Sequence, residues 1–269
     1  MQGHLKLGLS RRHFLFAGAA AGGGMMIGWA PTAKAQTKNI STLTPSAFIR
    51  IDPQNKVTIV SPAIEMGQGT FTALPMLVAE ELDIDVESVT VDHAPANDRL
   101  YGNPKIGNEQ ITGGSTSIRA FYLPLRKVGA AARTMLIAAA AEKWDTQAAS
   151  LRTDTGYVVD ASGNRRLSYG ELADRASKLP IPDNVTLKDP KSFKIIGTPK
   201  KRLDVSGKVD GSSIYGMDVK LPGMKTATVA ASPVFGGTLA SFDEAAAKRV
   251  PGVSQVAKLD SITGPRNKV

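Results

Sequence analysis

Residues 65–85, EMGQGTFTALPMLVAEELDID, decide how the first part of this chain folds. The start of this stretch, MGQG, is typical of a loop, since glycine there interrupts regular structure. From Thr70 onward the apolar side chains recur at helical spacing, at Phe71, Leu74, Leu77, Val78 and Leu82. We therefore expect a loop over residues 62–69 that leads into a helix over about residues 70–82. Glu80 and Glu81 are expected on the solvated face of that helix.

Strand patterns lie on both sides of this helix. Residues 48–51 and 57–60 carry alternating apolar side chains around the turn sequence DPQN, which predicts a β-hairpin. Val89 and Val91 mark a further strand after the helix. The expected order is hairpin, glycine loop, helix and strand.

A second glycine loop precedes a second and longer helix. The polar loop over residues 95–110 ends in TGGSTS, residues 112–117, and residues 118–144 then read as helix with Pro124 near its first turns. Alanines within residues 135–141 indicate close helix packing. Both glycine loops precede a helix N-terminus, where unpaired backbone N–H groups and the helix dipole favour an anion. The candidate binding residues are Gly67, Gln68, Gly69, Gly113, Gly114 and Ser115. Glycines before helices also serve simple turns, so each loop taken alone leaves both interpretations open.

The residue types exclude several kinds of site. The chain has no cysteine, which excludes disulfides, thiolate metal sites and iron–sulfur ligation. Gly67 and Gly69 do not begin a nicotinamide-binding fingerprint, because Thr72 stands where its third glycine should be. His93 is interpreted as a partly exposed loop histidine, and one histidine cannot build a multi-histidine zinc site. We assign no catalytic residue and no metal ligand, and Glu65 would be catalytic only if its loop turned it inward.

The first 35 residues have the layout of a twin-arginine export signal. The sequence SRRHFL, residues 10–15, precedes an apolar stretch diluted by glycine, and Ala33, Lys34 and Ala35 form a signal-peptidase pattern. From this layout we expect cleavage near Ala35 and a periplasmic product. Because the apolar stretch is shorter than the ~20 residues of a membrane-spanning helix, we expect no transmembrane anchor in the mature chain.

Charge argues against nucleic acid as a partner. The chain has 33 basic and 24 acidic residues, and four of the basic residues lie in the signal, which leaves 29 against 24. The remaining excess is scattered, and aromatic residues do not interleave with it as a nucleic-acid surface would favour.

The second half of the chain predicts an α+β continuation. Residues 157–159 and 166–167 indicate a second hairpin, and Ser168 with Glu171 forms a capping-box pattern for a short helix that ends near Lys178. The prolines of residues 181–201 predict a connector between domains. Beyond it, residues 213–220 and 227–231 are expected as strands and residues 243–249 as a helix. The predicted organisation is a signal over residues 1–35, an α+β segment over 36–180, the connector, and a further domain from residue 202 to 269.

Three stretches resemble one enzyme family. Residues 65–85 are similar to the molybdopterin-binding segment of the molybdenum hydroxylases, the xanthine dehydrogenase and aldehyde oxidase family. Residues 110–133, QITGGSTSIRAFYLPLRKVGAAAR, resemble the matching segment in the large subunit of isoquinoline 1-oxidoreductase-like members, which are exported by the twin-arginine route. Residues 202–253, which contain RLDVSGKVDGSSIYGMDVKLPGM, resemble the opening of the family's α/β hammerhead domain.

The resemblance implies a cofactor, a reaction and a partner. It implies a subunit that binds molybdenum–molybdopterin cytosine dinucleotide and hydroxylates an aldehyde or an N-heterocycle with oxygen taken from water. Electrons would leave through a separate iron–sulfur subunit. Gly67, Gln68 and Gly69 would contact the pterin or its phosphates, and Gly113, Gly114 and Ser115 would line the same pocket.

The sequence also departs from the family. The family's large subunit is much longer and carries a glutamate base near its C-terminus, whereas this chain has no G-x-G-E pattern. We therefore expect a truncated hammerhead domain, a catalytic base outside this chain, and a fragment that is inactive alone. The alternatives are a stand-alone periplasmic module that binds an anion or cofactor without turnover, and a structural partner of a separate catalytic chain.

Overall fold

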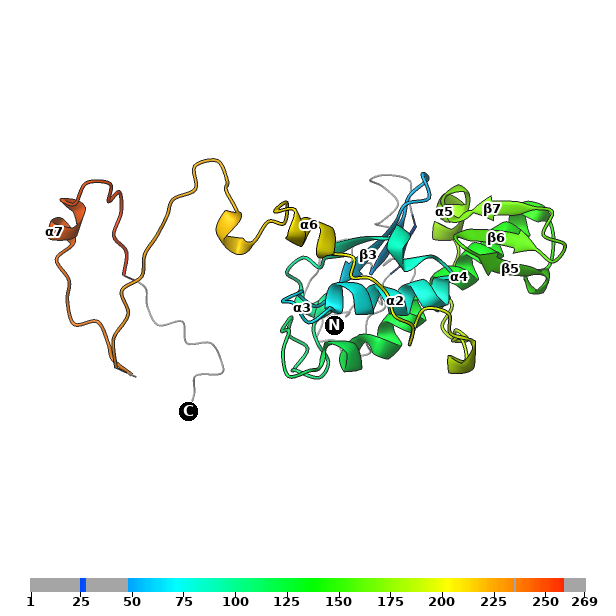
Figure 1. The fold of residues 1–269 in the computed structure, drawn as a ribbon, viewed down its shortest axis with the longest axis horizontal. Coiled ribbons are helices and arrows are strands. Elements are labelled where there is room, and N and C mark those ends of the chain that lie inside the picture. Colours follow the sequence, from blue (N-terminus) through cyan, green and yellow to red (C-terminus); the bar gives the residue numbers. More distant parts are fainter. Residues whose placement is uncertain (1–24, 28–47, 235, 259–269) are drawn as a thin grey trace, which may run out of the picture. The chain divides into compact units, whose positions relative to one another are not determined.

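The computed structural model describes residues 25–27, 48–234 and 236–258 of the chain. The chain divides into two compact units, Met1–Ser213 and Ile214–Val269. Within the described residues both β-sheets belong to the first unit (Figure 1). Apart from Met25–Ile27, the predicted export signal lies outside the described residues.

The first sheet has the strand order β1, β2, β3, β4, formed by Met25–Ile27, Ile49–Ile51, Val57–Ser61 and Thr90–His93. Strands β2 and β3 form the predicted hairpin, and β3 and β4 run parallel with Ser61 opposite His93. Helix α2, Thr70–Leu82, is the crossover between β3 and β4. The expected order of hairpin, glycine loop, helix and strand is confirmed. Strand β1 pairs antiparallel with β2 and comes from the stretch assigned above to the export signal.

Helices α2 and α4 pack against each other and form the centre of the unit. Helix α4, Ser117–Trp144, begins one residue before the predicted start. The two helices come close where α4 has no side chain, because a Cβ on Gly129 would lie 2.7 Å from the carbonyl oxygen of Val78. The core around them is mostly aliphatic, and its fully buried members include Ile49, Ile59, Leu74, Leu82, Leu125 and Leu136.

A smaller antiparallel sheet consists of β5, β6 and β7, which are Leu151–Asp154, Tyr157–Asp160 and Arg166–Ser168. Strands β6 and β7 are the predicted second hairpin. The predicted capping box is confirmed at the start of α5, Tyr169–Ser177, where Ser168 and Glu171 exchange hydrogen bonds. Buried Tyr169 donates its hydroxyl to the carbonyl of Leu82, 2.5 Å away, which ties α5 to α2. Short helical turns complete the unit at η2 Val86–Ser88, α3 Asp98–Tyr101, η3 Ala148–Ser150, η4 Pro190–Ser192 and α6 Val205–Val209.

The prediction that Glu80 and Glu81 are solvated is wrong, since both residues are 0% exposed. Glu81 accepts a hydrogen bond from Nε of Arg126 at 2.8 Å and pairs with Arg133 at 3.5 Å. Glu80 accepts from the backbone N–H of Ile195 at 2.6 Å. The helix turns these carboxylates inward because a later segment of the chain covers them with donors.

That covering segment is the proline-rich stretch predicted as a connector. Lys188 donates its backbone N–H to Glu81 and pairs through its ammonium with Glu80 and Asp83. Arg133 donates to the carbonyl of Thr186. Residues 186–196 therefore pack on α2 and α4 as part of the first unit, which extends to Ser213.

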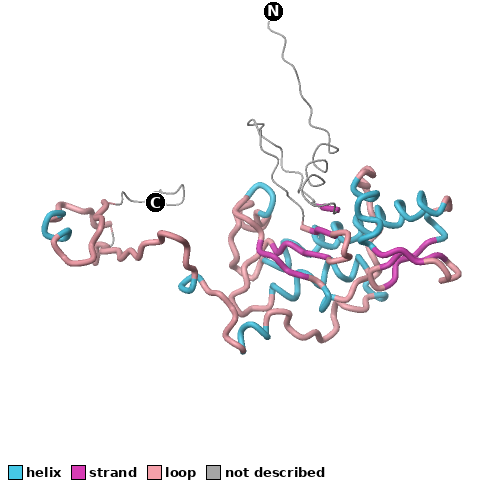
Figure 2. Tube along the Cα trace, turned by 90° about the horizontal axis from the view of Figure 1, so that it is seen from above, coloured by secondary structure: helices cyan, strands magenta, loops and turns pink. Residues whose placement is uncertain are grey.

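The second unit, described to residue 258, contains the helical turns η5, Gly216–Asp218, and α7, Glu244–Lys248. Helix α7 confirms the predicted helix, but the strands expected at residues 213–220 and 227–231 are not formed. No described segment pairs with these residues, and a strand without a hydrogen-bonded neighbour is not stable in water. Loops make up most of the unit in Figure 2, and apolar side chains such as Met217 and Val229 are exposed.

Candidate functional site

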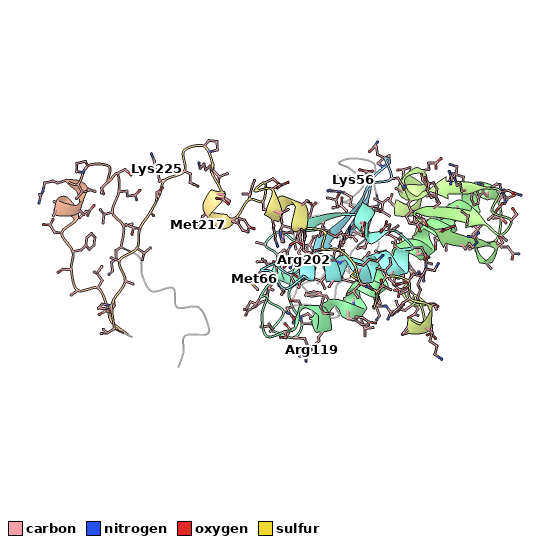
Figure 3. The ribbon with its side chains drawn as sticks, viewed as in Figure 1. Lys56, Met66, Arg119, Arg202, Met217 and Lys225 are labelled. Atoms are coloured by element: carbon pink, nitrogen blue, oxygen red, sulfur yellow. The ribbon has the colours of Figure 1, made fainter. Side chains whose placement is uncertain are left out.

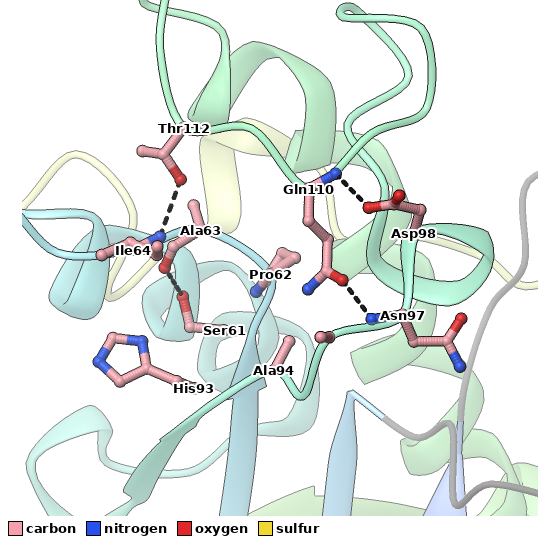
Figure 4. A pocket seen from close by; sticks show the side chains of 11 residues that line it. Ser61, Pro62, Ala63, Ile64, His93, Ala94, Asn97, Asp98, Gln110 and Thr112 are labelled. Atoms are coloured by element: carbon pink, nitrogen blue, oxygen red, sulfur yellow. Dashed lines mark hydrogen bonds between the residues drawn. The ribbon is translucent and has the colours of Figure 1, made fainter. Parts of the chain in front are cut away.

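The carboxyl ends of the parallel strands β3 and β4 meet at one edge of the first sheet, at Ser61 and His93. Ligands of open α/β sheets bind beyond the carboxyl ends of their strands, where the following loops separate. A pocket of about 500 Å³ lies at this edge (Figure 4). Its lining consists of Ser61, Pro62, Ala63, Ile64, His93, Ala94, Ala96, Asn97, Asp98, Gln110 and Thr112.

The first glycine loop, residues 62–69, and the second glycine loop, residues 112–117, meet beside this pocket. The backbone N–H of Ile64 donates to the hydroxyl oxygen of Thr112 at 2.9 Å, although the two residues are 48 positions apart. Figure 4 shows both residues on the pocket wall. The structure thus brings together the two loops that were singled out separately from the sequence.

Internal hydrogen bonds hold the opposite wall of the pocket. The side chain of Gln110 accepts from the backbone N–H of Asn97 and donates to the carbonyl of Pro95 at 3.1 Å. Its backbone N–H donates to the carboxylate of Asp98 at 2.7 Å. These contacts fold the long polar loop over residues 95–110 into a defined wall.

Glu65 occupies the position at the start of α2 that was predicted to receive an anion. Its carboxylate accepts hydrogen bonds from the backbone N–H groups of Gly67, Gly69 and Phe71 at 2.7, 3.0 and 2.9 Å. Arg202 adds a charged contact at 3.0 Å, and the side chain of Glu65 is only 6% exposed. Burial alone raises the pKa of this carboxyl, but the backbone hydrogen bonds and Arg202 outweigh it and leave the pKa below its ordinary value.

The first glycine loop therefore differs from the predicted anion cradle. The N–H groups of Gly67 and Gly69 already donate to Glu65. Gln68 also bonds within the loop, since its amide accepts from the N–H of Met66 at 2.5 Å and donates to the carbonyl of Ile64 at 2.8 Å. Both glycines have positive φ, 105° and 90°, and a Cβ on either would meet open space. A ligand can therefore approach the backbone of this loop closely.

The second glycine loop leaves its helix N-terminus without a side-chain cap. Gly114 and Ser115 adopt positive φ, and the hydroxyl of Thr116 donates to the carbonyl of Gly113 at 2.7 Å. Thr116 makes no side-chain capping bond to α4, and the first turn of α4 has no acidic residue. Of the two predicted cradles, only this one lacks an internal carboxylate.

Sequence reasoning considered Glu65 only as a possible catalytic residue and missed that it caps the loop; it also missed Arg202 and gave His93 little weight. Glu65 stands two residues before Gly67, a spacing that could have indicated a capping carboxylate. No sequence pattern could link Arg202 to this loop, because Arg202 lies 137 residues from Glu65 in the sequence. His93 is exposed at the end of β4, as predicted, and its ring packs on Phe71 with centroids 4.8 Å apart.

The described part of the chain contains no group of three or more His, Asp or Glu side chains placed to hold a metal ion. A search of the same residues finds no helix with the length and hydropathy needed to cross a membrane.

The amino-acid sequence of the chain is similar to known proteins. Residues 11–220 match the model of the molybdopterin cofactor-binding domain. The chain is 34% identical to the β subunit of isoquinoline 1-oxidoreductase from Brevundimonas diminuta over 93% of its length, and 28% identical to the B subunit of nicotinate dehydrogenase from Pseudomonas putida over 87%. It covers 37% and 20%, respectively, of those two proteins. A solved structure of reconstituted CO dehydrogenase from Oligotropha carboxidovorans aligns with 54% of this chain and covers 18% of its own chain, at 20% identity and a TM-score of 0.40.

Proposed function

Because the chain belongs to the molybdopterin cofactor-binding domain family, we propose that it forms part of the large subunit of an exported molybdenum hydroxylase. The observation that carries this proposal is the meeting of both glycine loops through Ile64 and Thr112, beside a pocket at the carboxyl ends of β3 and β4. Ligand sites of α/β sheets occur in such clefts beyond the carboxyl ends of the strands.

The residues present fit part of such a cofactor. Positive φ and open space at Gly67 and Gly69 let a flat ring system approach the backbone of the first glycine loop. The start of α4 has no acidic residue in its first turn, so an anionic phosphate at Gly114 and Ser115 would meet no like charge from that turn. The cradle at the start of α2 does not fit a phosphate, because Glu65 fills it with negative charge.

The residues of this chain would bind and orient the group. Gly67, Gln68 and Gly69 lie beside the pocket and do not line it, and from there they would contact the pterin. Gly113, Gly114 and Ser115, also outside the pocket lining, would receive its phosphates, in the molybdopterin cytosine dinucleotide form. The bound cofactor supplies the redox chemistry of hydroxylation.

The substrate and the electron acceptor follow from the same assignment. The two relatives are named for isoquinoline and nicotinate, which favours an N-heterocycle, and an aldehyde is the other substrate class of the resemblance. A separate iron–sulfur subunit would accept the electrons, as the family resemblance implies, and the absence of cysteine from these 269 residues agrees with this. The catalytic base would lie outside these 269 residues, and the chain alone would be inactive.

The test is to purify the native protein from the periplasm and to measure its intact mass, molybdenum, released pterin and cytidine nucleotide. The proposal expects a mass well above that of this chain, together with molybdenum, pterin and CMP in equal amounts. A protein of residues 36–269 without molybdenum would overturn it in favour of a stand-alone binding module.

A variant pair tests the site within the same preparation. Ser115→Ala combined with Thr112→Val is expected to lower pterin content, because it removes a hydroxyl from the second glycine loop and the bond that joins the two loops. The matched control, Ser162→Ala, changes an exposed hairpin residue and should leave pterin content unchanged. Equal pterin content in both variants would show that Ser115 and Thr112 do not contribute to the site.

A further inference from the structure

The first glycine loop is held from outside by a residue that follows the proline-rich stretch. Arg202 donates through Nη1 to the carbonyl of Gly67 at 2.9 Å and through Nη2 to the carboxylate of Glu65 at 3.0 Å. One guanidinium therefore contacts both the backbone of the loop and the carboxylate that organises it. Figure 3 places Arg202 and Met66 at the same end of α2.

Arg202 is itself fixed in place. Asp204 accepts from its Nε at 3.0 Å and from its Nη2 at 2.9 Å, which is the two-point pairing that a planar guanidinium favours. Leu203 donates its backbone N–H to the hydroxyl of Thr72 on α2 at 3.0 Å. The segment from residue 202 to 204 thus docks on the first turn of α2 through main chain and side chain together.

Glu65 connects the docked segment to the loop. Its carboxylate receives the N–H groups of Gly67, Gly69 and Phe71, so moving it would release three backbone donors at once. Gly67 and Gly69 have no side chains to hold their conformation, and both adopt positive φ. The shape of the loop therefore depends on Glu65, and the position of Glu65 depends on Arg202.

We propose that Arg202 is a positioning residue for cofactor binding: through Glu65 and Gly67 it holds the first glycine loop in the conformation that receives the pterin. This inference rests on the proposed function. With Arg202 in this role, retention of the cofactor depends on the docking of residues 202–204. These residues join the loop to the part of the chain that follows.

The experiment compares Arg202→Met with Lys208→Met in the full-length protein as purified. Lys208 pairs with Asp204 and not with the first glycine loop, so Lys208→Met controls for loss of one positive charge in the same segment. The measurements are hydrogen exchange of the peptide over residues 65–73 and the rate at which pterin is lost on dialysis. Arg202→Met should expose the amides of Gly67, Gly69 and Phe71 and release pterin roughly tenfold faster, the effect typical of residues that orient a cofactor's contacts. Lys208→Met should match the wild type in both measurements.

Two further variants separate positioning from general stability. Arg202→Lys keeps the charge beside Glu65 but not the forked contacts, so it should restore part of the pterin retention. Glu65→Gln should act in the same direction as Arg202→Met, and the double variant should be no worse than the more affected single variant, because both changes break one connection. These two variants also test the proposal if Arg202→Met does not fold.

The outcomes distinguish the inference from the proposed function. Wild-type pterin loss and loop exchange in Arg202→Met would overturn the inference while the function stands. Uniformly faster exchange over α2 and α4, with additive effects in the double variant, would also overturn it, because Arg202 would then act on the whole fold. Absence of pterin from the wild type would instead overturn the proposed function, and the exchange data alone would still decide whether Arg202 holds the loop.

Discussion

At the scale of single residues, the buried carboxylate of Glu81 shows that a buried charge is stabilised by its charged partners. It is 0% exposed and receives Arg126, whose side chain is 6% exposed, at an N···O distance of 2.7 Å. Arg126 also lies over the rings of Tyr122 and Phe193, with its central carbon 5.4 and 4.8 Å from their centroids. Removing one member of such a pair leaves a buried charge without its main partner.

Arg126→Met is therefore expected to lower the free energy of unfolding by about 3 kcal/mol, at the lower end of the range for broken buried pairs, because Arg133 still contacts Glu81. The measurement is urea denaturation. The control is Arg152→Met, which breaks an exposed pair with Asp154 and should change the free energy of unfolding by less than about 0.5 kcal/mol. Equal effects of the two substitutions would contradict the buried network.

Glu65 gives an acid-dependent contribution to stability. Its pKa in the folded protein is lower than its ordinary value of 4.5, so the carboxylate stabilises the fold above that value. As the pH falls through the folded pKa, the carboxylate binds a proton and the contribution is lost. Arg202 is the charged group that faces it.

The melting temperature of Glu65→Gln should therefore fall less steeply than that of the wild type between pH 5 and pH 3, since the amide does not titrate. Thermal unfolding followed at several pH values measures this difference. Parallel curves for the two proteins would show that Glu65 has an unperturbed carboxyl group.

At the scale of elements, the contact between α2 and α4 depends on Gly129. A glycine inside a helix costs about 1 kcal/mol relative to alanine. The structure explains its presence, because a Cβ at this position would lie 2.7 Å from the carbonyl oxygen of Val78 and 2.9 Å from Cβ of Glu81. Both neighbours belong to the packed face of α2 and cannot move aside without shifting that helix.

Gly129→Ala should therefore destabilise the fold by about 1–3 kcal/mol, the usual cost of overpacking, although alanine favours helix. Urea denaturation measures the change, and Gly163→Ala in the exposed β6–β7 turn provides a comparison with open space but a strained positive φ. A higher stability of Gly129→Ala would mean that the helices are further apart than described.

At the scale of the whole molecule, the two units differ in how their backbones are protected. The first unit pairs its strands and covers α2 with residues 186–196. The second unit forms no strand within residues 214–234 and 236–258, and it exposes apolar side chains including Ile214, Met217 and Val229. Backbone without sheet pairing or burial opens at low cost in free energy.

Trypsin added to the 269-residue chain should therefore cut first at exposed sites of the second unit, at Lys220, Lys225, Lys248 or Arg249. Mass spectrometry of a time course should show a persistent product that contains residues 48–213. Early cleavage within α2 or α4 would contradict this order of stability.

The amino-acid sequence by itself determined the elements whose signal is local. The helix over residues 70–82, the long helix after residue 117, both hairpins and the capping box at Ser168 each follow from periodicity or from turn and cap residues within one segment. The same local patterns identified both glycine loops. They did not show that Thr112 joins one loop to the other.

Only the tertiary structure decided which charges are buried and what the glycine loops offer a ligand. Glu80 meets the N–H of Ile195, 115 residues away, and Glu65 meets Arg202, 137 residues away. The spacing of residues along a helix shows which side chains share a face, but whether that face meets water or donors depends on the segment that covers it. For the same reason, the expected strands of the second unit did not form, because a strand pattern cannot supply the neighbour with which it must pair.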